Sequence, residues 1–128
     1  MKEIDILVVD DEPYILDILE QILSKAGYTI ITANNGIDAL EKLHEKQVKL
    51  VISDIMMPLK DGMELLADIQ RLWPNTAVIM LTGYANIQKA VDSMKTGAYD
   101  FFEKPISDYD RLLISIERAL EKRELLIE

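Results

Sequence analysis

Short runs of apolar, often β-branched residues recur along the chain and alternate with longer segments of helical periodicity. The runs begin about 22 to 27 residues apart, which leaves room for one crossover helix between successive strands, as in parallel βαβ units. The predicted strands are residues 4–9, 28–33, 50–53, 77–81 and 99–102.

The segments between these strands predict amphipathic helices. In the first, apolar residues recur every three or four positions and charged residues lie on the opposite face. Similar apolar stripes follow in three later segments, and the last of the three is short. Their members are Ile37, Leu40 and Leu43, then Leu65, Leu66, Ile69 and Leu72, then Ile87, Ala90, Val91 and Met94.

Local signals predict where these helices begin and end. Gly27 ends the first helix, where a left-handed residue is needed, and residues 34–36 form a plausible cap for the second. Pro74 ends the third helix at the preceding residue. Ser107, with Asp110 three residues later, resembles a capping box and predicts the start of a fifth helix.

Five strands alternating with five helices predict an α/β fold, a three-layer (βα)5 doubly wound sandwich around a parallel five-stranded sheet. Residues 28–33 mix polar and apolar positions and are therefore expected at an edge. The other four strands are apolar on both faces, which is typical of buried strands.

Composition narrows the class of protein. The length of 128 residues fits one domain, and a net charge of −9 argues against direct binding of nucleic acid or an anionic membrane. The lack of cysteine excludes disulfides and thiolate metal sites. No apolar run has the length of an export or membrane-spanning segment, so we expect a cytoplasmic location.

Polar residues that could take part in binding or catalysis follow four of the five strands. Ligands of open parallel sheets bind outside the carboxyl ends of the strands, so these side chains are expected on one rim. Each residue alone is explained equally well as a solvated loop or cap residue, but their joint placement favours a site. They are Asp10, Asp11 and Glu12, then Asp54, then Thr82, then Lys104 followed by Pro105.

Such a rim suits the chemistry of a phosphoryl group. Converging carboxylates repel one another unless a cation neutralises them, and a site with oxygen ligands alone favours Mg²⁺. The Lys104 ammonium and the Thr82 hydroxyl suit phosphoryl oxygens. Asp54, which lies centrally, could then act as a nucleophile and form an aspartyl-phosphate.

Four segments together resemble the receiver domain of response regulators, the phosphoacceptor half of two-component signalling. The resemblance extends from about residue 4 to residue 120 and implies a flavodoxin-like sheet of strand order 2-1-3-4-5. The segments are Val8-Val9-Asp10-Asp11-Glu12-Pro13, Asp54-Ile55-Met56-Met57-Pro58 with Asp61-Gly62, Leu81-Thr82-Gly83-Tyr84, and Gly97-Ala98-Tyr99-Asp100-Phe101-Phe102-Glu103-Lys104-Pro105.

The resemblance implies a phosphoacceptor and a metal site. Asp54 would attack the phosphohistidine of a sensor histidine kinase or a phosphotransfer domain. Asp11, Asp54 and the backbone carbonyl of Met56 would bind Mg²⁺, or Mn²⁺ in its place, with help from Asp10. The domain would be a phosphorylation-activated switch rather than an enzyme that turns over a separate substrate.

The resemblance also implies a switch. Thr82 and Lys104 would contact the phosphoryl oxygens, and the Lys104–Pro105 peptide would be cis. Thr82 would move toward the phosphoryl group and Phe101 would rotate inward. Together they would remodel the face of the fourth helix, fifth strand and fifth helix.

Two further positions bear on the lifetime of the phosphorylated state. Met56 and Tyr84 each lie two residues after a site residue and match the variable positions that flank the attacking water in this family. Neither side chain is suited to orienting that water, so slow self-dephosphorylation is expected. The alternative is that both side chains only pack or cover the pocket.

The end of the chain has helical period with no Gly or Pro to stop it. We expect residues 1–120 to form the receiver domain and residues 121–128 a helical extension toward an output module of a longer protein. A homodimer could form through this helix or through the fourth-helix, fifth-strand, fifth-helix face. His44 is expected on a solvated face, and Trp73 as a packing residue at a helix end.

Three other classes of protein share parts of this pattern. A haloacid-dehalogenase-type phosphatase would carry its nucleophile in Asp-x-Asp spacing after the first strand, which Asp10-Asp11-Glu12 lacks. A flavin-binding module would need a phosphate loop in that position, where three carboxylates would repel the phosphate. A degenerate receiver that only docks a partner should have lost Asp54 or Lys104.

Overall fold

The computed structural model describes residues 3–83 and 86–127 and contains the predicted alternation of strands and helices. Each predicted strand is present, with ends that differ by up to three residues. The elements are β1 (Glu3–Val9), α1 (Pro13–Lys25), β2 (Ile30–Ala33), α2 (Gly36–Glu45), β3 (Gln47–Asp54), α3 (Gly62–Leu72), β4 (Ala77–Thr82), α4 (Ile87–Thr96), β5 (Asp100–Glu103) and α5 (Tyr109–Leu126).

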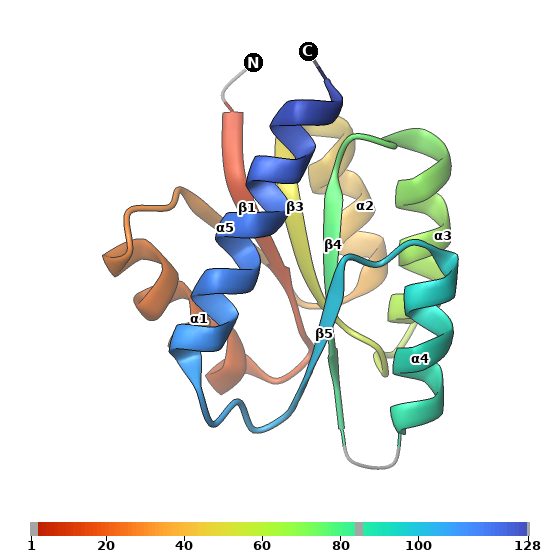
Figure 1. Ribbon diagram of the computed structural model, residues 1–128. Helices are drawn as coiled ribbons and strands as arrows, with labels where there is room; N and C mark the ends of the chain where they lie inside the picture. The colour runs from red at the N-terminus through yellow and green to blue at the C-terminus, as the bar shows by residue number, and fades with distance from the viewer. Residues whose placement is uncertain (1–2, 84–85, 128) are drawn as a thin grey trace.

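The strands form one parallel sheet in the order β2-β1-β3-β4-β5, which confirms the predicted fold. Helices α1 and α5 cover one face of the sheet, and α2, α3 and α4 cover the other (Figure 1). The carboxyl ends of all five strands therefore meet at one edge of the sheet. Both described ends of the chain lie at the opposite edge (Figure 1).

The apolar strands supply two hydrophobic cores. Successive residues of a strand point to opposite faces, so Leu7 and Val9 join the core under α2, α3 and α4, while Ile6 and Val8 join the core under α1 and α5. All four of these side chains are fully buried. A strand buried on both faces needs apolar residues at every position, which explains the continuous runs in the sequence.

The strand order expected from the resemblance places the second and fifth strands at the edges of the sheet, and β2 and β5 lie there. The apolar sequence of β5, taken alone, reads as a buried strand. Asp100 and Phe101 are only half-buried there, because an open sheet has two edges and β5 pairs with β4 alone. Within the described residues, no helix combines the length and apolar character needed to cross a membrane.

Most helix ends follow the sequence signals. Gly27 has a φ of 102° directly after α1, and the Asn35 side chain accepts a hydrogen bond of 2.8 Å from the Asp38 amide at the start of α2. The predicted cap of the last helix was wrong, because α5 starts at Tyr109. Its cap is therefore Asp108, whose carboxylate accepts from the Arg111 amide at 3.1 Å.

Helix α4 packs less completely than its apolar stripe suggests. Ala90 is buried, whereas Ile87, Val91 and Met94 are each about two-fifths exposed. The small Ser93 is fully buried beside Ala90, and its hydroxyl donates to the Ala90 carbonyl at 2.6 Å. The helix therefore contacts the sheet through small residues and leaves larger apolar ones at the surface.

Gly62 closes the connection between β3 and α3. Its amide donates to the Ile55 carbonyl at 2.8 Å, and α3 begins there with a reciprocal capping box between Asp61 and Glu64. A Cβ atom on Gly62 would overlap the carbonyl oxygen of Asp54 and lie 2.8 Å from the Cα atom of Ile55. This glycine allows the start of α3 to pack directly against the end of β3.

The substitution Gly62→Ala should therefore destabilise the domain, by about 1–3 kcal/mol as is typical of overpacked sites. Gly83→Ala is a matched control, since a Cβ atom there would come no closer than 3.9 Å to any described residue other than its chain neighbours. Urea unfolding followed by circular dichroism measures both free energies. Equal stability of the two variants would contradict this account of Gly62.

Candidate functional site

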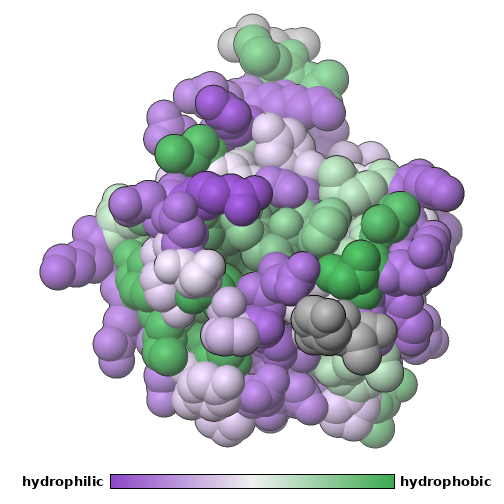
Figure 2. Space-filling model, turned by 60° about the horizontal axis from the view of Figure 1, so that its bottom comes forward, coloured by the Kyte–Doolittle hydropathy of each residue, from purple (hydrophilic) through white to green (hydrophobic). Residues whose placement is uncertain are grey.

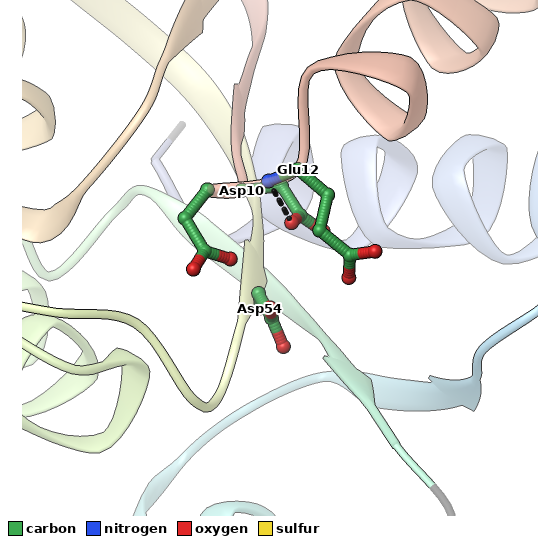
Figure 3. Close-up of side chains that lie close together, drawn as sticks. Asp10, Glu12 and Asp54 are labelled. Carbon is green, nitrogen blue, oxygen red and sulfur yellow. Dashed lines mark hydrogen bonds between the residues drawn. The ribbon is translucent and has the colours of Figure 1, made fainter.

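The carboxyl edge of the sheet brings together the residues that follow its strands. Asp10 follows β1, Asp54 is the last residue of β3 and Lys104 follows β5. In Figure 3 the side chains of Asp10, Glu12 and Asp54 converge on one small region. The surrounding face carries hydrophilic residues interspersed with hydrophobic ones (Figure 2).

The Lys104 ammonium contacts three carboxylates. Its Nζ atom lies 3.1 Å from Asp10 Oδ2, 2.8 Å from Glu12 Oε1 and 3.0 Å from Asp54 Oδ2. Burial alone lowers the pKa of Lys104, but the hydrogen bonds to Glu12, Asp54 and Asp10 outweigh it and raise this pKa above its usual value. Lys104 is therefore a permanent positive charge within the carboxylate cluster.

The two central carboxylates are almost fully buried. Asp10 is inaccessible to solvent and Asp54 is 4% exposed. Burial raises the pKa of Asp10 to about 6, and the charge of Asp54 adds to the increase, although Lys104 and the Glu12 amide (2.9 Å) oppose it. Burial also raises the pKa of Asp54, against the opposing effect of its hydrogen bond with Lys104.

The same region offers oxygen ligands to a cation. Asp10, Asp11, Glu12 and Asp54 each present a carboxylate oxygen, and these four oxygens lie within 4.8 Å of one another. A donor set made of oxygen alone fits a hard cation such as Mg²⁺. Four carboxylates against the single ammonium of Lys104 also leave negative charge for a divalent cation to neutralise.

The proposed switch residues lie beside this cluster. Thr82 is fully buried at the end of β4, and its hydroxyl donates to the Gly83 carbonyl at 3.0 Å. Phe101 is half-buried in β5 and packs against the core under α2, α3 and α4. The Lys104–Pro105 peptide is cis, the conformation that the resemblance implies.

Of the two positions linked to dephosphorylation, Met56 lies within the described residues. Met56 is 49% exposed in the loop after β3, its amide lies 3.4 Å from Asp54 Oδ1, and its sulfur lies 3.4 Å from the Lys89 ammonium. Tyr84 lies outside the described residues.

Glu12 is the site residue whose role the sequence did not reveal. Its acidic side chain follows Asp10 and Asp11, but only the folded chain brings it to Lys104, 92 residues away. It makes the shortest of the three contacts of Lys104, although its side chain is 45% exposed. Nothing in the periodicity of the sequence distinguishes such a residue from an ordinary helix-capping acid.

The fold and the site define an α/β domain with a half-buried lysine among carboxylates at the carboxyl edge of its sheet, and comparison with known proteins identifies the family. The family model of the response regulator receiver domain matches residues 6–117, so the chain belongs to this family. It is thus a phosphorylation-controlled signalling domain. This family is distinct from the phosphatase and flavin-binding classes that share parts of the sequence pattern.

The chain is similar to parts of larger regulators. It is 40% identical over 124 residues to the transcriptional regulatory protein ZraR of Klebsiella oxytoca, covering 97% of this chain and 28% of that protein. It is 43% identical over 123 residues to the nitrogen assimilation regulatory protein NtrX of Azorhizobium caulinodans, covering 94% and 27% respectively. The chain thus spans little more than a quarter of these relatives.

Solved structures show the same fold. The receiver domain of NtrX from Brucella abortus is 43% identical, with a TM-score of 0.87 over 91% of this chain and 98% of that one. A receiver domain protein from Clostridium thermocellum is 33% identical, with a TM-score of 0.90 over 99% of this chain and all of that one.

The buried charge of Asp10 should reduce stability at neutral pH. A carboxyl group whose pKa is raised by folding destabilises the folded state when it is ionised. The free-energy cost of the Asp10 charge is therefore full above about pH 6 and vanishes toward pH 4, where the group is protonated in both states. We expect Asp10→Asn to raise the free energy of unfolding at pH 7 by about 2 kcal/mol.

Urea unfolding between pH 4 and 7.5 measures this effect, with the exposed Asp17→Asn on α1 as the matched control. The advantage of Asp10→Asn should disappear as the pH falls below 6. An advantage that grew toward acidic pH would have the wrong sign and would contradict the assignment.

Proposed function

We propose that Asp54 accepts a phosphoryl group from a sensor histidine kinase or a phosphotransfer domain. The observation that supports this most directly is the position of Asp54, nearly buried within the carboxylate cluster and 3.0 Å from the Lys104 ammonium. A carboxylate that receives phosphoryl groups needs nearby positive charge, because nucleophile and phosphoryl oxygens are both negative.

The proposed transfer uses groups that this chain supplies. An oxygen of Asp54 bonds to phosphorus as the bond from phosphorus to the donor imidazole breaks, and the electron pair of that bond returns to the imidazole. Lys104 turns from its carboxylate partners to the phosphoryl oxygens. Asp10, Asp11, Asp54 and the Met56 carbonyl would hold Mg²⁺, or Mn²⁺, and a cation bound there would offset negative charge on both reactants.

The phosphoryl group then changes the surface of the domain. It brings about two negative charges and three acceptor oxygens, and the Thr82 hydroxyl exchanges its bond with Gly83 for one to the phosphoryl group. Phe101 moves inward from its half-buried position and remodels the face formed by α4, β5 and α5. Phenylalanine carries no hydroxyl, so packing alone holds its inward state.

We further propose a wider setting for this switch. Residues 1–120 form the receiver, which does not turn over a separate substrate, and residues 121–128 extend α5 toward an output module in a longer cytoplasmic protein. The α4–β5–α5 face or α5 itself mediates a homodimer, and Ile114 on α5 is 50% exposed. The net charge of −9 makes direct contact with nucleic acid or a membrane unfavourable.

Incubation with acetyl phosphate should add one phosphoryl group to the chain, and the reaction should require Mg²⁺. Intact-mass measurement with and without Mg²⁺ detects the adduct. Asp54→Asn should abolish it, whereas the exposed Asp17→Asn should not. A folded wild-type protein that gained no adduct would contradict the proposed function.

The phosphorylated state should decay slowly, because neither Met56 nor Tyr84 can orient an attacking water. The double substitution Met56→Asn and Tyr84→Glu supplies an amide and an acid at these positions. It should speed the decay by about tenfold or more, as measured by the loss of the adduct mass over time. Decay as slow as in the wild-type protein would show that these side chains only cover the site.

A further inference from the structure

A cavity of about 480 Å³ lies at the amino edge of the sheet, opposite the carboxylate cluster. It opens to solvent and is lined by the end of α2, the start of β3, the segment between α3 and β4, and the last turns of α5. This is the edge at which the described ends of the chain lie (Figure 1). Its volume falls within the range of small-molecule sites in proteins.

The charge of this cavity contrasts with that of the chain. The protein contains 23 acidic residues and only 14 lysines and arginines, yet no Asp or Glu is found among the described residues that line the cavity. His44, Lys46 and Arg123 line it instead. A neighbouring cavity of about 420 Å³, which shares Arg123 and adds Lys122, also has no carboxylate among its described lining residues.

Arg123 has an unused hydrogen-bond donor. Its Nε atom is the single buried side-chain nitrogen or oxygen without a partner in residues 3–83 and 86–127. Its Nη1 atom donates to Glu124 Oε1 at 3.0 Å, and that glutamate is 58% exposed. An arginine guanidinium is a planar fork of donors that matches a carboxylate, and buried donors in folded proteins nearly always have an acceptor.

Part of the cavity lining is aromatic. The rings of His44 and Trp73 lie 4.9 Å apart between centroids and are inclined by 70°, an edge-to-face arrangement. Leu43 and Val48 are buried behind them. This part of the lining gives a flat apolar group a surface to pack against, and the basic side chains lie around it.

We propose that this cavity binds a small organic carboxylate with a flat apolar body. The Arg123 guanidinium turns from Glu124 to receive the carboxylate, and the apolar body packs against Trp73. Lys46 adds positive charge at the rim. The site is separate from the phosphoacceptor site, so it does not depend on the function proposed above.

Titration of the 128-residue protein with benzoate, followed by nitrogen-15 NMR, tests this site. Trp73 is the only tryptophan, so its indole N–H signal reports directly on the cavity. We expect this signal and the Arg123 Nε–H signal to shift together with a dissociation constant of about 1 mM, as for a ligand of few atoms. Acetate, which lacks the apolar body, and benzyl alcohol, which lacks the charge, should each bind at least about tenfold more weakly.

Substitutions distinguish the guanidinium from general positive charge. Arg123→Gln should weaken benzoate binding by about tenfold or more, and Arg123→Lys should restore it only in part, because lysine keeps the charge but not the fork. Arg118→Gln, on the exposed side of the same helix and outside this cavity, should leave binding unchanged. The circular dichroism spectrum of each variant establishes that it is folded.

Three results would overturn the proposal. They are a Trp73 signal that does not move with benzoate, equal shifts with acetate or benzyl alcohol, and a benzoate affinity that Arg123→Gln leaves unchanged. A Trp73 shift with the same benzoate dependence in the folded Arg123→Gln variant as in the wild-type protein would mean that benzoate contacts the aromatic residues without the carboxylate pairing proposed here.

Discussion

The contacts of Lys104 with Asp10, Glu12 and Asp54 are the interaction on which the acidic rim depends. Carboxylates this close and this buried would otherwise repel one another or take up protons. One ammonium from the far edge of the sheet allows them to coexist as charged groups. Lys104 is held there by backbone pairing, since its amide donates to the carbonyl of Thr82, the last residue of β4, at 2.8 Å.

Features set by local sequence patterns were predicted well, and features set by contacts between distant residues were not. Continuous apolar runs identified every strand. The rule for open parallel sheets correctly predicted from the sequence that Asp10, Asp54 and Lys104 lie at one edge. The sequence misjudged features that depend on tertiary neighbours. Helix α5 starts at Tyr109, so its N-cap is Asp108 and not the predicted Ser107. The contact of Glu12 with Lys104 joins residues far apart in the chain, and no local sequence pattern encodes it.

The carboxyl and amino ends of the strands carry side chains of opposite charge. The carboxyl edge gathers acids around a lysine, and the amino edge gathers basic and aromatic side chains around a cavity that no Asp or Glu lines within residues 3–83 and 86–127. Helix α5 relates the two, because it begins beside the loop that carries Lys104 and ends with Arg123 in its last turns. The Ser115 hydroxyl donates to Asp100 at 2.7 Å, which fastens the middle of this helix to β5.

The position of β5 in the chain has a consequence for biosynthesis. Synthesis of the chain proceeds from the amino terminus, so four strands and all four clustered carboxylates are complete well before Lys104, the residue that neutralises them, emerges. Until β5 docks on β4, the rim is an uncompensated cluster of acids, and contacts that span 94 and 50 residues must form late. A nascent or truncated chain that lacks β5 therefore has no Lys104 contact in its site, so only a completely synthesised domain has a complete site.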